Sequence, residues 1–165
     1  MMRVTHLLPL AAAALFGVDA QSQRLGPGGL KLEGRMEIVA ARHATYEVGA
    51  GVSYPLSSYA RAAVWASGGW PIGDVSTEQR VPNGIARAEG VVRFLLDPFK
   101  ERERGFYAGA GVGVRWVADA SGTEYLLVLL GLEREVVGVL TAIELGVGDG
   151  ARVALVFRQP RRGYR

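Results

Sequence analysis

The chain of 165 residues contains no cysteine and only two histidines. Without cysteine there is no disulfide framework, no thiolate nucleophile and no cysteine-held zinc or iron–sulfur site. Two histidines also leave few nitrogen ligands for any other metal. We therefore expect the protein to hold no metal and no cofactor.

Long apolar runs are missing as well. The longest uninterrupted apolar run after the first twenty residues is the seven-residue stretch from Leu126 to Leu132, which includes Gly131. A membrane-spanning helix needs about 20 predominantly apolar residues. The sequence therefore predicts no transmembrane helix beyond its N-terminal segment.

The formal net charge is only +3, and no basic face with interleaved aromatic residues occurs in the interior of the chain. This composition does not favour nucleic-acid binding. Hydrophobic residues make up 49% of the chain and glycine accounts for 23 residues, which is too apolar for a disordered chain and too glycine-rich for a helical bundle. The composition favours a single domain of β structure.

The first twenty residues have the features of an export signal. A short basic start, Met1-Met2-Arg3, precedes an apolar stretch from Leu7 to Phe16, and Val18-Asp19-Ala20 supplies modest or small residues before Gln21. We expect cleavage after Ala20. The alternative is an N-terminal membrane anchor, but the apolar stretch is short for one and Pro9 interrupts it. The predicted organisation is a signal peptide (1–20), a lead segment (21–31), a β-barrel (32–159) and a basic tail (160–165).

From Leu32 onwards the chain divides into eight segments with period-2 alternation, each bounded by Gly, Pro, Asp or Ser residues. Their lengths are close to the 9–11 residues that a tilted strand needs to cross a bilayer. The segments are Leu32–Arg42, Tyr46–Tyr54, Tyr59–Ser67, Ala86–Leu96, Phe106–Ala118, Glu124–Glu133, Val136–Val147 and Ala151–Gln159. This pattern predicts an all-β protein, an eight-stranded antiparallel up-and-down transmembrane barrel, with a turn at Arg134-Glu135 and a long loop from Gly68 to Ile85.

Within these segments nearly every charge falls on one parity, and so on one face of each strand. The charged parity comprises Glu33, Arg35, Glu37, Glu47, Arg61, Arg87, Glu89, Arg93, Arg115, Glu133, Glu144, Arg152 and Arg158. The opposite parity is apolar, with residues such as Met36, Val48, Val112 and Leu130. An arginine facing lipid at the bilayer midplane costs about 2–4 kcal/mol. We therefore expect the charges to form an interior network and the apolar parity to face lipid.

A soluble exported barrel or sandwich is the alternative, with the apolar parity facing a core or an apolar ligand and the charges facing water. Alanines on the apolar parity and Leu127, Leu129 and Leu140 on the charged parity favour this alternative. The transmembrane and soluble alternatives differ in which parity faces water.

Aromatic residues fall where an interfacial girdle would need them. We assign Tyr46, Trp70 and Trp116 to one rim, and Tyr54, Tyr59, Phe99, Phe106 and Phe157 to the other. The loop 68–85 is the only sizeable connection with mixed chemistry, and loops on a rigid scaffold often carry recognition. Its candidate binding residues are Trp70, Asp74, Glu78 and Arg80.

The signal peptide, the eight alternating segments and the charged interior resemble the small outer-membrane β-barrel superfamily of the OmpA and OmpX type. The local stretch from Asp97-Pro98-Phe99 through the glycine-alternating segment Gly105 to Gly113 is similar to a turn and strand common in those barrels. The resemblance covers about Leu32 to Gln159. It implies a location in the outer membrane of a diderm bacterium, contact with outer-membrane lipid, and a role in anchoring, envelope integrity or adhesion.

We expect no enzymatic activity. Interior acids such as Glu89 and Glu144 are matched by arginines, which favours structural ion pairs over acid–base catalysis. Some barrels of this superfamily modify lipid A. The deacylase type uses a histidine on one of the last strands, whereas here no histidine follows His43. Three alternatives remain in order of preference: a structural or adhesive barrel that binds an envelope or extracellular partner through loop 68–85, a soluble barrel for an apolar ligand, and a lipid-modifying enzyme.

Overall fold

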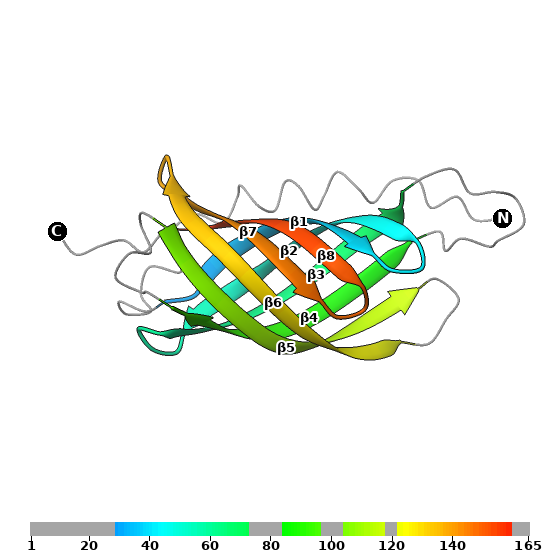
Figure 1. Ribbon diagram of the computed structural model, residues 1–165, viewed down its shortest axis with the longest axis horizontal. Helices are drawn as coiled ribbons and strands as arrows, with labels where there is room; N and C mark the ends of the chain where they lie inside the picture. Colours follow the sequence, from blue (N-terminus) through cyan, green and yellow to red (C-terminus); the bar gives the residue numbers. More distant parts are fainter. Residues whose placement is uncertain (1–28, 73–83, 97–103, 118–121, 160–165) are drawn as a thin grey trace, which may run out of the picture.

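The structure, a computed structural model, describes residues 29–72, 84–96, 104–117 and 122–159. It contains eight strands: β1 (Lys31–Ala40), β2 (Ala44–Pro55), β3 (Ala60–Pro71), β4 (Ile85–Leu95), β5 (Gly105–Val117), β6 (Thr123–Val136), β7 (Val139–Val147) and β8 (Ala151–Arg158). Each strand pairs with the next in antiparallel register, and β8 returns to pair with β1, so that the sheet closes into a barrel (Figure 1). The prediction of an all-β, eight-stranded antiparallel up-and-down barrel is confirmed.

The two ends of the barrel differ in their connections. One end, here called the terminal end, carries the start of β1, the end of β8 and the turns at 56–59 and 137–138. The opposite end, here called the loop end, carries the turns at 41–43 and 148–150 and the strand ends that lead into and out of 72–84 and 118–122. In Figure 1 the loop end lies to the right and the terminal end to the left.

The expected turn at Arg134-Glu135 is wrong. Both residues belong to β6, and the reversal occurs at Val137-Gly138, where both residues have positive φ angles of 49° and 74°. Strand pairing continues here because Arg134 and Glu135 find partners in Thr141 and Leu140 on β7. Charged residues are tolerated in this hairpin because it lies at an end of the barrel.

The expected start of the long loop at Gly68 is also wrong. β3 continues to Pro71 because β2 starts early, at Ala44, and supplies partners: Tyr46 pairs with Trp70, and Thr45 pairs with Pro71. Trp70 is therefore a strand residue. Asp74, Glu78 and Arg80 lie outside the described residues, as do the predicted signal peptide, most of the lead segment and the tail 160–165.

Glycines on the inner face make room for large side chains of the neighbouring strand. Three inner glycines, Gly51, Gly113 and Gly131, pair in register with Trp65, Tyr125 and Tyr107, respectively. A Cβ atom on any of these glycines would overlap the aromatic residue opposite. Aromatic side chains covering strand glycines are a known device for pinning register and filling a barrel. The same residues that fill the interior thus fix how the strands pair.

Candidate functional site

The inner face of the barrel gathers twelve buried charged side chains, six glutamates and six arginines. They are Glu33, Arg35, Glu37, Glu47, Arg61, Arg87, Glu89, Arg93, Glu133, Glu144, Arg152 and Arg158. Each belongs to the parity that the sequence assigns to the interior. An eight-stranded barrel is just wide enough for side chains to fill, and the equal numbers of acids and arginines leave these twelve groups with no net formal charge.

Glu144 on β7 is the centre of this network. Its Oε2 accepts a hydrogen bond from Arg35 Nη1 at 2.5 Å, and its Oε1 accepts from Tyr107 Oη at 2.6 Å and from Arg158 Nη2 at 3.1 Å. Arg93 Nη2 also lies 3.0 Å from Glu144 Oε1. A carboxylate in a low-dielectric interior is stable only when its charge and lone pairs are satisfied. Three guanidinium groups and a phenol meet that need here.

Towards the terminal end the network continues through Arg158. This arginine donates to Glu33 from Nε at 2.8 Å, to Tyr107 from Nη2 at 3.0 Å, and to Glu133 from Nη1. Arg61 also binds Glu133, at 3.2 Å. β3, β6, β8 and β1 are therefore held together across the lumen as well as through their backbone pairing.

Towards the loop end the network continues through Arg35, Glu37, Arg152 and Glu89. Arg35 Nε donates to Glu37 Oε2 at 3.2 Å, and Arg152 Nε lies 3.7 Å from the same oxygen. Arg152 Nη1 in turn donates to Glu89 at 2.8 Å, and Tyr125 Oη also donates to Glu89. The charged contacts thus form one chain along the lumen.

A second cluster lies at the mouth of the loop end. Glu47 accepts from Thr45 at 3.0 Å, Ser67 at 3.0 Å and Arg87 at 2.8 Å. Asp149, in the turn between β7 and β8, lies 2.9 Å from Arg87 and 2.8 Å from Arg115. Arg115 is 26% exposed, unlike the other predicted interior arginines, because it lies at this mouth. The two arginines hold the β7–β8 turn against the end of the barrel.

Sequence reasoning did not single out four members of this network: Trp65, Tyr107, Tyr125 and Asp149. Trp65 is buried beneath two guanidinium groups, with Arg35 and Arg93 at 4.7 Å and 5.1 Å from its ring centroid. A cation over an indole face is attracted by the ring quadrupole. The available signal was the presence of inner glycines on neighbouring strands, which marks where large inner side chains fit.

The outer face of the barrel has the opposite character. Within the eight described strands, the outward parity carries two charged residues, Glu124 and Arg134, near opposite ends of β6. Elsewhere the outward parity is aliphatic, aromatic or small, with bulky residues such as Leu130 and Ile143 exposed. An apolar surface that surrounds a whole molecule far exceeds the patches of a few hundred Å² found on soluble monomers.

Aromatic residues lie towards both ends of this outer face. Tyr46, Trp70 and Trp116 are exposed towards the loop end, and Tyr54, Phe106 and Phe157 towards the terminal end. Tyr59 lies in the turn before β3, and Phe94 on β4 adds an exposed aromatic residue towards the terminal end. Phe99 lies outside the described residues.

The soluble ligand-binding alternative requires an interior lined mainly with apolar side chains. The described strands do not form such an interior. The interior does contain a cluster of ten buried apolar and aromatic residues, among them Leu127, Leu129 and Val156, but twelve buried charged side chains share the same lumen. His43 lies in the exposed β1–β2 turn. In the described part of the chain, no group of three or more His, Cys, Asp or Glu side chains is placed to hold a metal ion.

No protein-family model and no curated protein matches this sequence. Among solved structures, the chain is similar to one described as "De novo design of transmembrane beta-barrels", with a TM-score of 0.49 and 18% sequence identity. The alignment covers 78% of this chain and 93% of that chain. Among the described residues, none forms a helix long and apolar enough to cross a membrane.

Proposed function

We propose that this protein is a non-enzymatic barrel that spans the outer membrane of a diderm bacterium. The observation that carries the proposal is the division of charge between the two faces: twelve buried charged residues inside, and an outward parity whose only charges within the described strands are Glu124 and Arg134. In a water-soluble protein the charged residues would lie outside and the apolar residues inside. In lipid it places each kind of side chain in its preferred environment.

The positions of the two outward charges support a membrane of ordinary thickness. Glu124 and Arg134 are ten residues apart on β6. At about 3.3 Å per residue and a strand tilt of about 40°, this separation corresponds to a height of roughly 25 Å. The apolar band of a transmembrane barrel is about 25 Å tall. The outward residues between the two charges are Leu126, Val128, Leu130 and Leu132.

The state of the interior supports a structural or adhesive role over a catalytic one. The buried glutamates are engaged by arginines or by tyrosine and serine hydroxyl groups, so they serve to hold the wall together. We assign recognition of an envelope or extracellular partner to the β3–β4 connection, between Pro71 and Ile85, because it is the longest break between consecutive strands. The N-terminal segment would act as the export signal, with the termini on the periplasmic side.

The test is membrane fractionation of the protein expressed in a diderm bacterium with its own N-terminal segment. We expect it to sediment with outer membranes and to migrate faster on a gel when unheated than after boiling, because the closed barrel resists detergent. A soluble periplasmic monomer with no heat-dependent shift would contradict the proposal. Shortening the 73–83 segment should leave the heat shift intact and reduce cell aggregation or adherence.

A further inference from the structure

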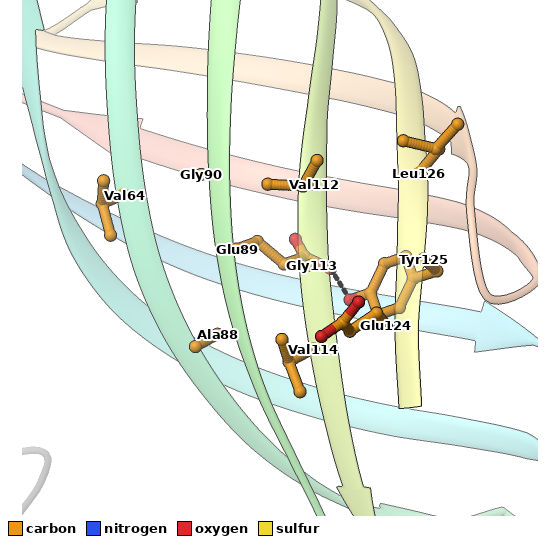
Figure 2. Close-up of a pocket in the computed structure, with 10 residues that line it drawn as sticks. All are labelled: Val64, Ala88, Glu89, Gly90, Val112, Gly113, Val114, Glu124, Tyr125 and Leu126. Carbon is orange, nitrogen blue, oxygen red and sulfur yellow. Dashed lines mark hydrogen bonds between the residues drawn. The ribbon is translucent and has the colours of Figure 1, made fainter. Parts of the chain in front are cut away.

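The outer wall is hollowed towards the loop end, over β3 to β6. The hollow has a volume of about 670 Å³ and opens outward between strands (Figure 2). Its outward lining consists of Val64, Ala88, Gly90, Val112, Val114 and Leu126, with Glu124 at its edge. The volume lies within the range of about 300–1,000 Å³ that is typical of small-molecule sites.

The hollow exists because its floor has almost no side chains. Gly90 points outward, and a Cβ atom placed on it would meet nothing within 4 Å. Ala88, one of the two outward neighbours of Gly90 on β4, is also small, whereas Leu126 on β6 extends from the wall and is 76% exposed. Glu89, Gly113 and Tyr125 of the inner parity also border the hollow, but its outward side chains other than Glu124 are apolar and suit a hydrocarbon chain.

One end of the hollow is polar, and an exposed tryptophan lies beyond it on β5. Glu124 pairs in register with Val114, and its carboxylate extends over β5 towards that valine (Figure 2). Trp116 follows on the same face of β5, with its indole beside Gly122. In the described part of the chain, no cation or hydrogen-bond donor is paired with the Glu124 carboxylate. A carboxylate attracts ammonium groups by charge, and an exposed indole attracts them through its ring quadrupole.

We propose that this hollow binds a membrane lipid whose headgroup carries an ammonium group. The acyl chain lies over Ala88 and Gly90, and the ammonium group lies between the Glu124 carboxylate and the Trp116 ring. The inference rests on the proposed membrane location. It goes further by assigning a specific site and headgroup chemistry to one part of the wall.

A second copy of the chain fits the hollow less well. Copies in one membrane insert with the same end up, so a twofold contact through this face would bring the two Glu124 side chains together. Like charges at the edge of an apolar interface repel one another. An ammonium headgroup instead supplies the opposite charge.

The test is native mass spectrometry of the folded protein in detergent, with phosphatidylethanolamine or phosphatidylglycerol of identical acyl chains added. We expect phosphatidylethanolamine to be retained about three- to tenfold more strongly, as a carboxylate contact and a cation–π contact together allow. Glu124→Gln should abolish this preference. Gly90→Leu should weaken retention of both lipids, because a Cβ atom at residue 90 meets nothing within 4 Å and the leucine side chain extends into the hollow.

Two matched controls are available. Gly34 is an outward glycine on β1, and its Cβ position is likewise free of neighbours within 4 Å, so Gly34→Leu should leave lipid retention unchanged. Arg134→Gln removes the other outward charge of the described strands and should leave the headgroup preference unchanged. Equal retention of the two lipids by the unmodified protein, or no effect of Gly90→Leu, would overturn the lipid site. So would a dimer that Gly90→Leu dissociates. Failure to enter membranes at all would instead overturn the proposed function.

Discussion

Tyr107 on β5 lies directly over Gly131 on β6, and its hydroxyl group donates to Glu144 on β7, the residue that pairs with Gly131. The ring therefore occupies the space that a Cβ atom on residue 131 would need. Its hydroxyl group is held at the same time, because it also accepts from Arg158. This pair of residues therefore fixes the strand register, fills the interior and takes part in the charge network.

Gly131→Ala should therefore destabilise the barrel. The tyrosine cannot move aside without breaking its bonds to Glu144 and Arg158, so we expect a loss of about 1–3 kcal/mol in the free energy of unfolding, as for other overpacked interiors. Urea unfolding in lipid vesicles measures this. Gly34→Ala is the control, because its Cβ position is open. Equal midpoints for the two variants would show that the tyrosine ring does not lock this site.

Glu144→Gln should be among the most damaging changes in the interior. It removes the negative charge that faces Arg35, Arg93 and Arg158. Breaking a buried ion pair on one side costs about 3–5 kcal/mol, because the partner charge is left uncompensated. The measurement is again the free energy of unfolding. Glu124→Gln on the outer face should change it by less than about 0.5 kcal/mol; a similarly small effect at Glu144 would refute the central role of this residue.

Val137→Asn should stabilise the β6–β7 hairpin. Val137 has a φ of 49°, a conformation that β-branched residues disfavour and that two-residue hairpins usually assign to Asn or Gly. Relief of this strain should add about 1 kcal/mol to the free energy of unfolding. Val136→Asn is the control, because Val136 is exposed in the same hairpin but has no positive φ. The interpretation fails if both variants shift stability alike.

Leu130→Arg tests which surface faces lipid. Leu130 lies on the outer face near the midpoint between Glu124 and Arg134, so an arginine there should cost about 2–4 kcal/mol in a bilayer. Val136→Arg lies close to the end of the barrel and should cost about 0–1 kcal/mol. The comparison is made by unfolding in vesicles. In a water-soluble barrel both arginines would be solvated, and the difference between the two variants would vanish.

The strand pattern could be predicted from the sequence because inward and outward residues alternate so regularly. Segments such as Val136–Val147 and Ala151–Gln159 differ from β7 and β8 by only a few residues at their ends. The ends are harder to predict because they depend on the partner strand. Trp70 joins β3 only because Tyr46 is available opposite.

The partners within the interior could not be predicted from parity alone. Parity places Glu144 and Arg93 on the inner face, but their contact joins β7 to β4, which are not neighbours in the barrel. Such contacts depend on strand tilt and on which inner positions lack side chains. Asp149 was overlooked because it lies in a turn, where its contact with Arg87 and Arg115 has no counterpart in strand alternation.

The closing pair, β1 and β8, joins the first and last strands of the barrel: Glu33 lies opposite Arg158 and bonds to it. All other neighbouring strands are connected directly along the chain. The same cylinder could therefore be cut at another connection, such as 56–59, and its original ends joined by a short linker, with every strand keeping its neighbours. Such a circular permutant would move the single long-range seam to a different place on the wall, and its rate of assembly would show whether closure at β1 and β8 is the slow step.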